Sequence, residues 1–130
     1  MSKKSFLAKV QFSAHHDLSA LAIRLSATTG VAMPYDESGR YDEVPAFIGE
    51  HGELELTLFG PPEEHRTDEC VLVLRMHTEH TLEALRGTLP KFFWTVLINK
   101  EPNERGYIDC SGELALALHA GGFVDCSPVT

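Results

Sequence analysis

The sequence lacks the short motifs by which many small enzymes are recognised. It has no G-x-S-x-G nucleophile elbow, no P-loop, no G-x-G-x-x-G loop and no C-x-x-C pair. These absences exclude the sequence contexts in which a nucleophilic serine, a phosphate cradle or a paired cysteine site is usually found. We therefore expect that this protein is not an enzyme and that it needs no cofactor.

Long apolar runs and a full set of cysteine pairs are also missing. No apolar run approaches the roughly 18 residues that cross a bilayer. Lys9 and Gln11 interrupt the pattern where a signal peptide would be apolar. The three cysteines, Cys70, Cys110 and Cys126, cannot all pair within one chain, which favours a reducing compartment. We expect a cytoplasmic protein with no membrane partner.

Basic residues are few, with 11 Lys and Arg against 19 Asp and Glu and a net charge of −8. Nucleic-acid binding needs clustered cations to neutralise phosphates, so this balance argues against it. The fragment Arg105-Gly106-Tyr107-Ile108 resembles the opening of the strand signature in the RNA-recognition motif. Asp109 then stands where that signature needs an aromatic residue to stack on a base. We therefore expect no nucleic-acid partner.

The acidity is concentrated in residues 36–69. This stretch carries eleven acids and two bases, Arg40 and Arg66, for a net charge of −9, whereas the rest of the chain sums to +1. The acids are Asp36, Glu37, Asp42, Glu43, Glu50, Glu53, Glu55, Glu63, Glu64, Asp68 and Glu69. Such a field attracts a basic surface and speeds its approach, although the same charges could simply keep an exposed sheet soluble.

A hairpin is predicted within the acidic stretch, with residues 44–48 turning back through residues 53–59. Polar and apolar residues alternate along 53–59, which is the period of a strand with one buried face. We expect its leucines to pack on a core while Glu53, Glu55 and Thr57 face water together. Gly52 supplies the turn because glycine tolerates a positive φ.

The remaining elements are predicted from periodicity and from stop signals. We expect strands over 5–13, 71–74, 93–99, 106–110 and 123–126, and helices over 17–28, 81–89 and 111–119. Side-chain caps are available at Ser13 or Asp17, at Thr78 or Thr81, and at Ser111.

This order of elements predicts a single α+β domain over residues 1–130. It has a mainly antiparallel sheet, two main helices packed on one face and a short C-terminal helix. A ferredoxin-like core with additions is the closest simple match. The strand order stays open.

Metal ligands and nucleophiles can be selected from the sequence only as loose sets. His77 and His80 are three positions apart, and no second ligand pair has a matching spacing. Cys110, His119 and Cys126 could converge around the third helix. Surface histidines and small buried cysteines explain the same residues without a metal, so we expect none.

The closing pattern Ser111-Gly112-Glu113-Leu114-Ala115-Leu116, followed by Gly121-Gly122-Phe123, is a capped short helix that feeds a terminal strand. In this pattern, and in size, charge and organisation, the chain resembles the immunity proteins of bacterial polymorphic toxin systems, in particular those of contact-dependent growth inhibition. The resemblance implies tight binding to one cognate toxin, often a nuclease, whose substrate groove is basic. No functional residue carries over, because these families share no diagnostic residues.

The resemblance implies that the acidic stretch meets the toxin. The candidate contact residues are Asp36, Glu37, Tyr41, Asp42, Glu43, Glu53, Glu55, Glu63 and Glu64. Tyr35 and Tyr41 are candidate aromatic anchors, which would slow dissociation. Two alternatives stay open: a small-molecule-binding or regulatory ferredoxin-like domain with an apolar pocket, and a thiol- or metal-dependent enzyme that uses Cys110, His119 and Cys126. The oligomeric state is not predicted.

Overall fold

The computed structural model describes residues 4–12, 18–35, 46–60 and 70–129. Within these ranges one sheet is formed by β1 (Lys4–Phe12), β2 (Ala46–His51), β3 (Leu54–Phe59), β4 (Cys70–Thr78), β5 (Ile108–Asp109) and β6 (Cys126–Pro128). The helices are α1 (Leu18–Thr29), α2 (Leu82–Arg86), the 3-10 helix η1 (Lys91–Trp94) and α3 (Ser111–Ala120). The strand order is β2-β3-β4-β1, with β5 and β6 both paired to the far edge of β1.

Strand β1 buries one face because its sequence alternates between apolar and polar residues. Phe6, Ala8, Val10 and Phe12 are fully buried on one face, while the residues between them are partly exposed on the other. Strand β4 pairs antiparallel with β1 along its whole length and has the same alternation. The two strands therefore supply the centre of the buried face.

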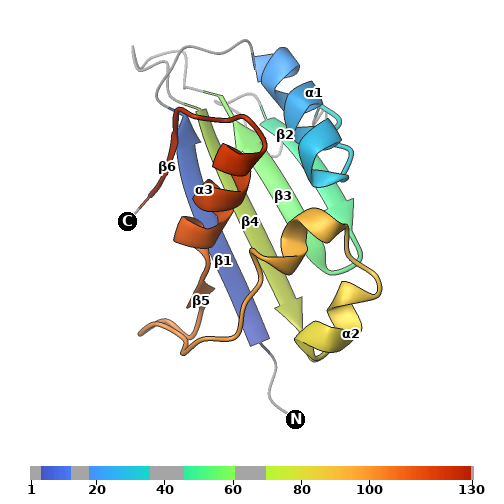
Figure 1. Cartoon of the computed structure of the whole chain (residues 1–130), viewed down its shortest axis with the longest axis vertical. Helices are drawn as coiled ribbons and strands as arrows, with labels where there is room; N and C mark the ends of the chain where they lie inside the picture. The colour runs from blue at the N-terminus through green and yellow to red at the C-terminus, as the bar shows by residue number, and fades with distance from the viewer. Residues whose placement is uncertain (1–3, 13–17, 36–45, 61–69, 130) are drawn as a thin grey trace.

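The described helices lie on one face of the sheet (Figure 1). One core cluster joins them to the strands, with Leu21 and Leu25 from α1, Phe93 from η1, and Leu114 and Leu118 from α3. No described helix covers the opposite face, which we call the open face. None of the helices in the described ranges is long and apolar enough to cross a bilayer.

The far edge of β1 is divided between two short strands of opposite direction. Strand β5 pairs parallel with Phe6 and Leu7, and β6 pairs antiparallel with the last three residues of β1. The first residue of α3 fills the gap between them, because the Ser111 Oγ accepts a hydrogen bond from the Lys9 amide at 2.9 Å. The carbonyls on either side accept from Cys110 and Val129. This edge is therefore satisfied from Leu7 to Phe12.

The structure confirms an α+β class with a mainly antiparallel sheet and helices packed on it. The connections differ in one respect from a ferredoxin-like split βαβ unit, in which the two strands flanking the helix are parallel. Here β1 and β2 flank α1 but are separated by both β3 and β4. Because every step from β1 through β4 and β3 to β2 is antiparallel, β2 runs opposite to β1.

The strand predicted over 93–99 is wrong. The chain instead forms η1 and an irregular turn, and the helix predicted to reach Leu89 ends at Arg86. Burial explains the difference, because Phe93, Val96 and Leu97 are the buried residues of this segment. That spacing is helical and not alternating. The aromatic and β-branched composition favoured a strand, and packing on the core overrode it.

The predicted caps and ends are correct for some helices and wrong for others. Thr81 caps α2, since its Oγ1 accepts from the Ala84 amide at 3.2 Å. Ser111 does not cap α3; it is the first residue of that helix, and Asp109 accepts its amide at 2.9 Å. Gly121 ends α3 as predicted. The last strand begins at Cys126, later than expected, and the caps proposed at residues 13 and 17 lie outside the described residues.

Candidate functional site

Two of the nine predicted contact residues, Glu53 and Glu55, lie within the described ranges. The other seven lie outside the described residues: Asp36, Glu37, Tyr41, Asp42, Glu43, Glu63 and Glu64. The site is therefore built from the hairpin β2–β3 and from the sheet around it. The leucines of β3 are buried as predicted. The turn has a positive φ of 60° at Gly52 and a negative φ at the next residue, which is the pattern of a type II′ hairpin.

Glu55 lies on the open face in a row that crosses the sheet. Its register partners are Glu50 on β2 and Arg75 on β4. The Oε1 of Glu55 also accepts a hydrogen bond from the Thr57 hydroxyl at 3.4 Å. Like charges directly opposite each other destabilise a sheet, so Glu50 beside Glu55 has an electrostatic cost that Arg75 offsets on one side only. Two carboxylates thus stand side by side on the hairpin.

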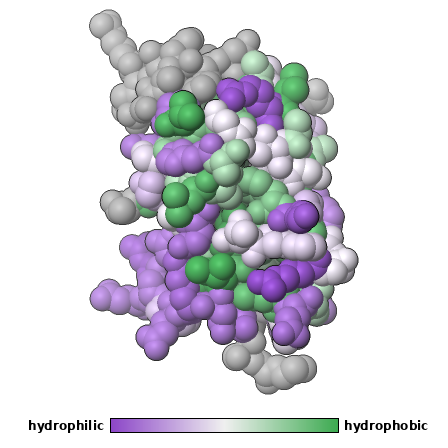
Figure 2. Space-filling view, viewed as in Figure 1, coloured by the Kyte–Doolittle hydropathy of each residue, from purple (hydrophilic) through white to green (hydrophobic). Residues whose placement is uncertain are grey.

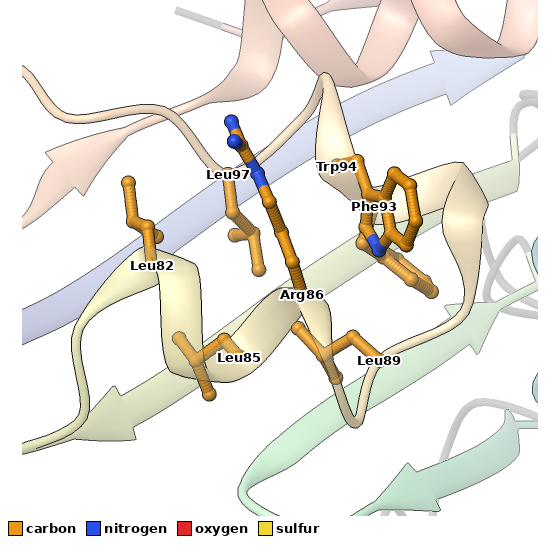
Figure 3. A pocket seen from close by; sticks show the side chains of 7 residues that line it. All are labelled: Leu82, Leu85, Arg86, Leu89, Phe93, Trp94 and Leu97. Atoms are coloured by element: carbon orange, nitrogen blue, oxygen red, sulfur yellow. The ribbon is translucent and has the colours of Figure 1, made fainter.

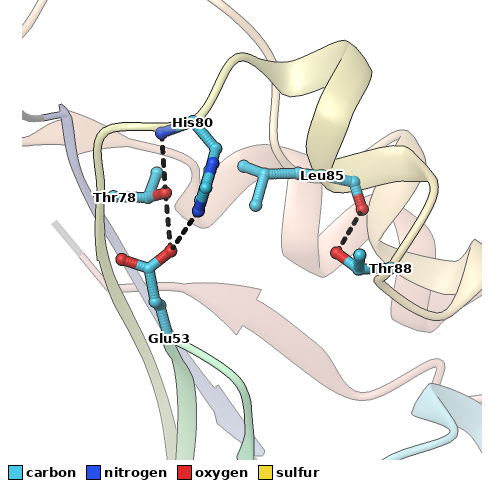
Figure 4. A network of polar contacts seen from close by, with 5 residues as sticks. All are labelled: Glu53, Thr78, His80, Leu85 and Thr88. Carbon is cyan, nitrogen blue, oxygen red and sulfur yellow. Dashed lines mark hydrogen bonds and ion pairs between the residues drawn. The ribbon is translucent and has the colours of Figure 1, made fainter.

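Glu53 does not share that surface, contrary to the prediction. It is a turn residue, and its carboxylate bends toward the start of the α2 region (Figure 4). Its Oε1 accepts from the Thr78 hydroxyl at 2.8 Å and lies 3.6 Å from the His80 Nε2. Thr78 is fully buried and also accepts from the His80 amide. Glu53 therefore closes the β4–α2 connection, which is a structural role.

One end of the sheet borders the two other acidic parts of the sequence. Ala46, Phe59 and Val71 form one row there, at the start of β2, the end of β3 and the start of β4. Residues 36–45 precede Ala46 and carry a net charge of −3. Residues 61–69 lie between β3 and β4 in sequence and also carry −3. Both acidic segments are joined to this same end of the sheet.

An apolar row lies on the open face between that end and the two glutamates. Ile48, Thr57 and Val73 are in register across β2, β3 and β4. Thr57 and Val73 are only 3% and 6% exposed, although no described helix covers them, and Ile48 is partly exposed. Thr57 shares the face of Glu55 as predicted but is buried and not solvated. On the open face, the described residues thus place the partly exposed Ile48 in the row beside the Glu50–Glu55 pair.

Tyr35 lies beside the edge strand β2. It forms an antiparallel bridge to Phe47, and the two rings pack edge to face with centroids 5.3 Å apart. Its side chain is still 53% exposed. Ring packing fixes the orientation of Tyr35, and the exposed half of the ring remains accessible near the acidic end.

Cys110, His119 and Cys126, which the sequence left as a set that could converge around the third helix, do not come together as ligands. Cys110 precedes α3 and His119 is near its end, which separates them by roughly 13 Å at 1.5 Å per residue. His119 donates to the Cys126 carbonyl at 2.7 Å, and the Cys126 thiol donates to Phe123 O at 3.3 Å. Across the described ranges, no three His, Cys, Asp or Glu side chains are grouped to hold a metal ion.

Burial weakens the case for a cysteine nucleophile. All three are buried. Burial raises the pKa of the Cys110 thiol, a direction that a backbone hydrogen bond from Ile98 only partly opposes. Burial likewise raises the pKa of Cys126, and the Asp125 carboxylate adds to it. A raised pKa reduces the thiolate fraction at neutral pH.

A serine–histidine contact escaped the sequence analysis because its two members come from distant strands. The Ser5 Oγ lies 2.7 Å from the His77 Nδ1, and the His77 ring lies 6.0 Å from the Tyr107 ring. A nucleophilic serine also needs a group that orients the histidine and donors for an oxyanion. The contacts of the described residues supply neither, so we assign this pair no catalytic role.

A shallow groove lies between α2 and η1 (Figure 3). We call it the α2–η1 groove; its lining residues are Leu82, Leu85, Arg86, Leu89, Phe93, Trp94 and Leu97. Its cavity volume of about 10 Å³ is about enough for one water molecule. A small-molecule site usually needs a few hundred Å³, so this groove gives the ligand-binding alternative no support. The sequence analysis missed this groove because it predicted a strand over residues 93–99, where the structure has η1.

The described residues thus offer an acidic and partly apolar protein surface. Comparison with protein-family models, with curated proteins and with solved structures gave no match to this chain.

Proposed function

We propose that this protein binds and neutralises a basic protein domain, in the manner of an immunity protein acting on a cognate toxin such as a nuclease. It acts by occupancy and not by catalysis. The single observation that carries the proposal is the arrangement of charge around the open face. The Glu50–Glu55 pair lies on one side of the apolar row, and the two acidic segments join the sheet on the other.

This arrangement matches the anatomy of protein interfaces. Such interfaces have an apolar, water-excluding centre and a polar rim. Ile48 is the partly exposed apolar residue of this surface, and it lies in the row next to Glu50 and Glu55. The distance along the strands from Glu55 to Phe59 is roughly 13 Å at about 3.3 Å per residue. A partner of ordinary size spans that distance with a single contact patch.

The charges explain how a partner would be chosen. A nuclease domain carries cations around its substrate groove, and an acidic surface attracts them before contact. Such steering raises the association rate, most strongly at low salt, because the Debye length is about 10 Å at 0.1 M. Once bound, the acidic surface would occupy the positions that substrate phosphates take. Slow dissociation would come from apolar contacts at the partly exposed Ile48 and not from Tyr35, because Tyr35 packs on Phe47, which is in register with the buried Leu58 on the helix-covered side.

The test uses the protein encoded directly upstream in the genome as the partner. Its terminal domain would be mixed with the full chain, and complex formation and residual toxicity would be measured. We expect a stoichiometric complex and loss of toxicity. A neighbouring domain that ignores this chain, or that binds while keeping its activity, would count against the proposal.

The surface is tested by removing charge without changing shape. In Glu50→Gln with Glu55→Gln, we expect the association rate to fall about threefold to tenfold at low salt, with the fold unchanged. The matched control is Glu101→Gln with Glu104→Gln, two exposed acids before β5, which is at the other edge of the sheet from β2. Equal association rates for the two double variants would show that the open face is not the docking surface.

A further inference from the structure

A second surface suited to protein binding lies on the helix-covered side of the sheet, opposite the open face. Figure 2 shows hydrophobic patches between polar ones on this side of the molecule. Trp94 is 38% exposed at the α2–η1 groove, beside the buried side chains of Leu85, Phe93 and Leu97. Leu89 is partly buried and closes one side. The groove therefore has an apolar floor with an aromatic wall.

Cations border this groove, although the chain as a whole is acidic. Arg86 is exposed and extends across it in Figure 3. Lys91 lies with its Nζ 5.9 Å from the centre of the Trp94 ring. The described ion pairs join His80 to Glu53 and Lys100 to Glu113, and Arg86 takes part in neither. The guanidinium of Arg86 is thus available to a carboxylate from outside.

Trp and Arg are the residue types most enriched where binding energy concentrates in protein interfaces. Arg forms paired hydrogen bonds with a carboxylate, and its methylene stem covers apolar surface when no partner is present. The small volume of the groove fits that description, because the Arg86 side chain itself occupies the opening. Rotation of an exposed side chain is fast and needs no change in the backbone.

We propose that the α2–η1 groove is a docking site for an acidic peptide segment that carries a large aliphatic side chain. The aliphatic side chain takes the place of the Arg86 stem, over Leu85 and against Trp94. Arg86 moves aside and pairs with a neighbouring carboxylate of the peptide, and Lys91 contributes a second cation. Charge complementarity selects this occupant, since a basic peptide would meet two cations at the rim. The proposal is independent of the acidic face and of the function proposed for it.

The experiment uses intrinsic fluorescence, because Trp94 is the only tryptophan in the sequence and lines the groove. The full chain would be titrated with a short blocked peptide in which two leucines are flanked by glutamates. Two matched peptides serve as controls: one with serines in place of the leucines, and one with lysines in place of the glutamates. We expect a saturable change in Trp94 emission with the first peptide only, below about 1 mM.

Variants of the rim decide whether the charge argument holds. Arg86→Glu should weaken binding about tenfold or more, because it replaces a charge-assisted pair with a repulsion. Lys91→Glu should weaken it less. The matched control is Arg105→Glu, which reverses an exposed cation in the loop before β5 and should leave binding unchanged. Arg86 is exposed, so the fold should survive, and far-ultraviolet circular dichroism would verify it.

Three results would overturn the proposal. They are the absence of a saturable signal up to about 1 mM, equal binding of the lysine peptide, and equal binding by Arg86→Glu. Titration with decanoate separates a carboxylate lipid from a peptide: binding of decanoate without binding of the glutamate–leucine peptide would also overturn the assignment to a peptide. The toxin-complex experiment can fail or succeed without affecting any of these readouts.

Discussion

Replacement of Gly49 by alanine tests how the edge strand β2 is held to the rest of the fold. Gly49 faces the buried side, in register with Leu56. A Cβ built there would lie 2.5 Å from the Ala32 carbonyl oxygen and 3.0 Å from Val31 and from Met33. The segment after α1 therefore crosses β2 so closely that only glycine fits.

The magnitude follows from those distances. Ordinary carbon–oxygen contacts are about 3.3 Å or longer, so the backbone at Ala32 must move by roughly 0.8 Å. Overpacking of this kind destabilises by about 1–3 kcal/mol, and the larger half of that range applies because the closest atom belongs to the backbone. A glycine-to-alanine change also stabilises by about 0.4–1 kcal/mol through the unfolded chain. The net expectation for Gly49→Ala is a loss of about 1–2.6 kcal/mol.

Urea denaturation followed by circular dichroism would measure this loss as a lower midpoint with an unchanged slope. Gly112→Ala is the matched control, because the same atom is added in α3 with nothing within 4 Å. It should be neutral or stabilising by up to about 1 kcal/mol, since alanine favours a helix. Gly52→Ala separates strain from crowding, because its φ is positive and its surroundings are open. Equal stability of Gly49→Ala and Gly112→Ala would refute the close-approach argument.

Two further predictions concern buried polar groups. Ser111→Ala should lower the free energy of unfolding by about 1–3 kcal/mol, because the Lys9 amide loses its acceptor; Ser111→Thr, measured in the same urea series, should retain more of the stability if the hydroxyl matters. Cys110 and Cys126 should resist alkylation in the native protein at neutral pH and react in urea. Burial raises the pKa values of both thiols in the folded protein. The contribution of the two protonated thiols to the free energy of unfolding should therefore be complete below the ordinary thiol pKa of 9.0. It should be lost as the pH rises through their pKa values in the folded protein. Rapid native alkylation of Cys110 would contradict its burial.

The sequence predicted the elements that local pattern determines. The alternation in residues 5–13 and 53–59 identified β1 and β3, together with the burial of the phenylalanines of β1 and the leucines of β3. It failed at residues 93–99, where β-forming composition competed with a helical spacing of buried positions. The residue types of a segment indicate its local preference for a strand, whereas the spacing of its apolar positions indicates which conformation can pack on the core. The spacing of Phe93, Val96 and Leu97 favours a helical turn over a strand.

The candidate surface was predicted only in part. The alternation correctly placed Glu55 on the open face. It placed Glu53 there as well, because alternation of polar and apolar residues does not show where a strand begins. The turn at Gly52 removes Glu53 from the strand. The pairing of Glu50 with Glu55 depends on strand register, and the α2–η1 groove depends on tertiary packing. Neither the Glu50–Glu55 pairing nor the groove can be predicted from a single sequence without the strand order and the packing of the helices.

The divided edge of β1 has a consequence for how the protein folds. Phe12 pairs with Cys126, 114 positions later in the sequence, and the Lys9 carbonyl accepts from Val129. Pairings between residues this far apart in the sequence require a long loop to close, which costs conformational entropy and slows folding. During synthesis, β1 can pair with β4 long before residues 126–129 exist, so its far edge stays open in the meantime. An open edge is a template for pairing with another chain. The last strand and Ser111 therefore end the period in which the far edge of β1 is open to pairing with another chain.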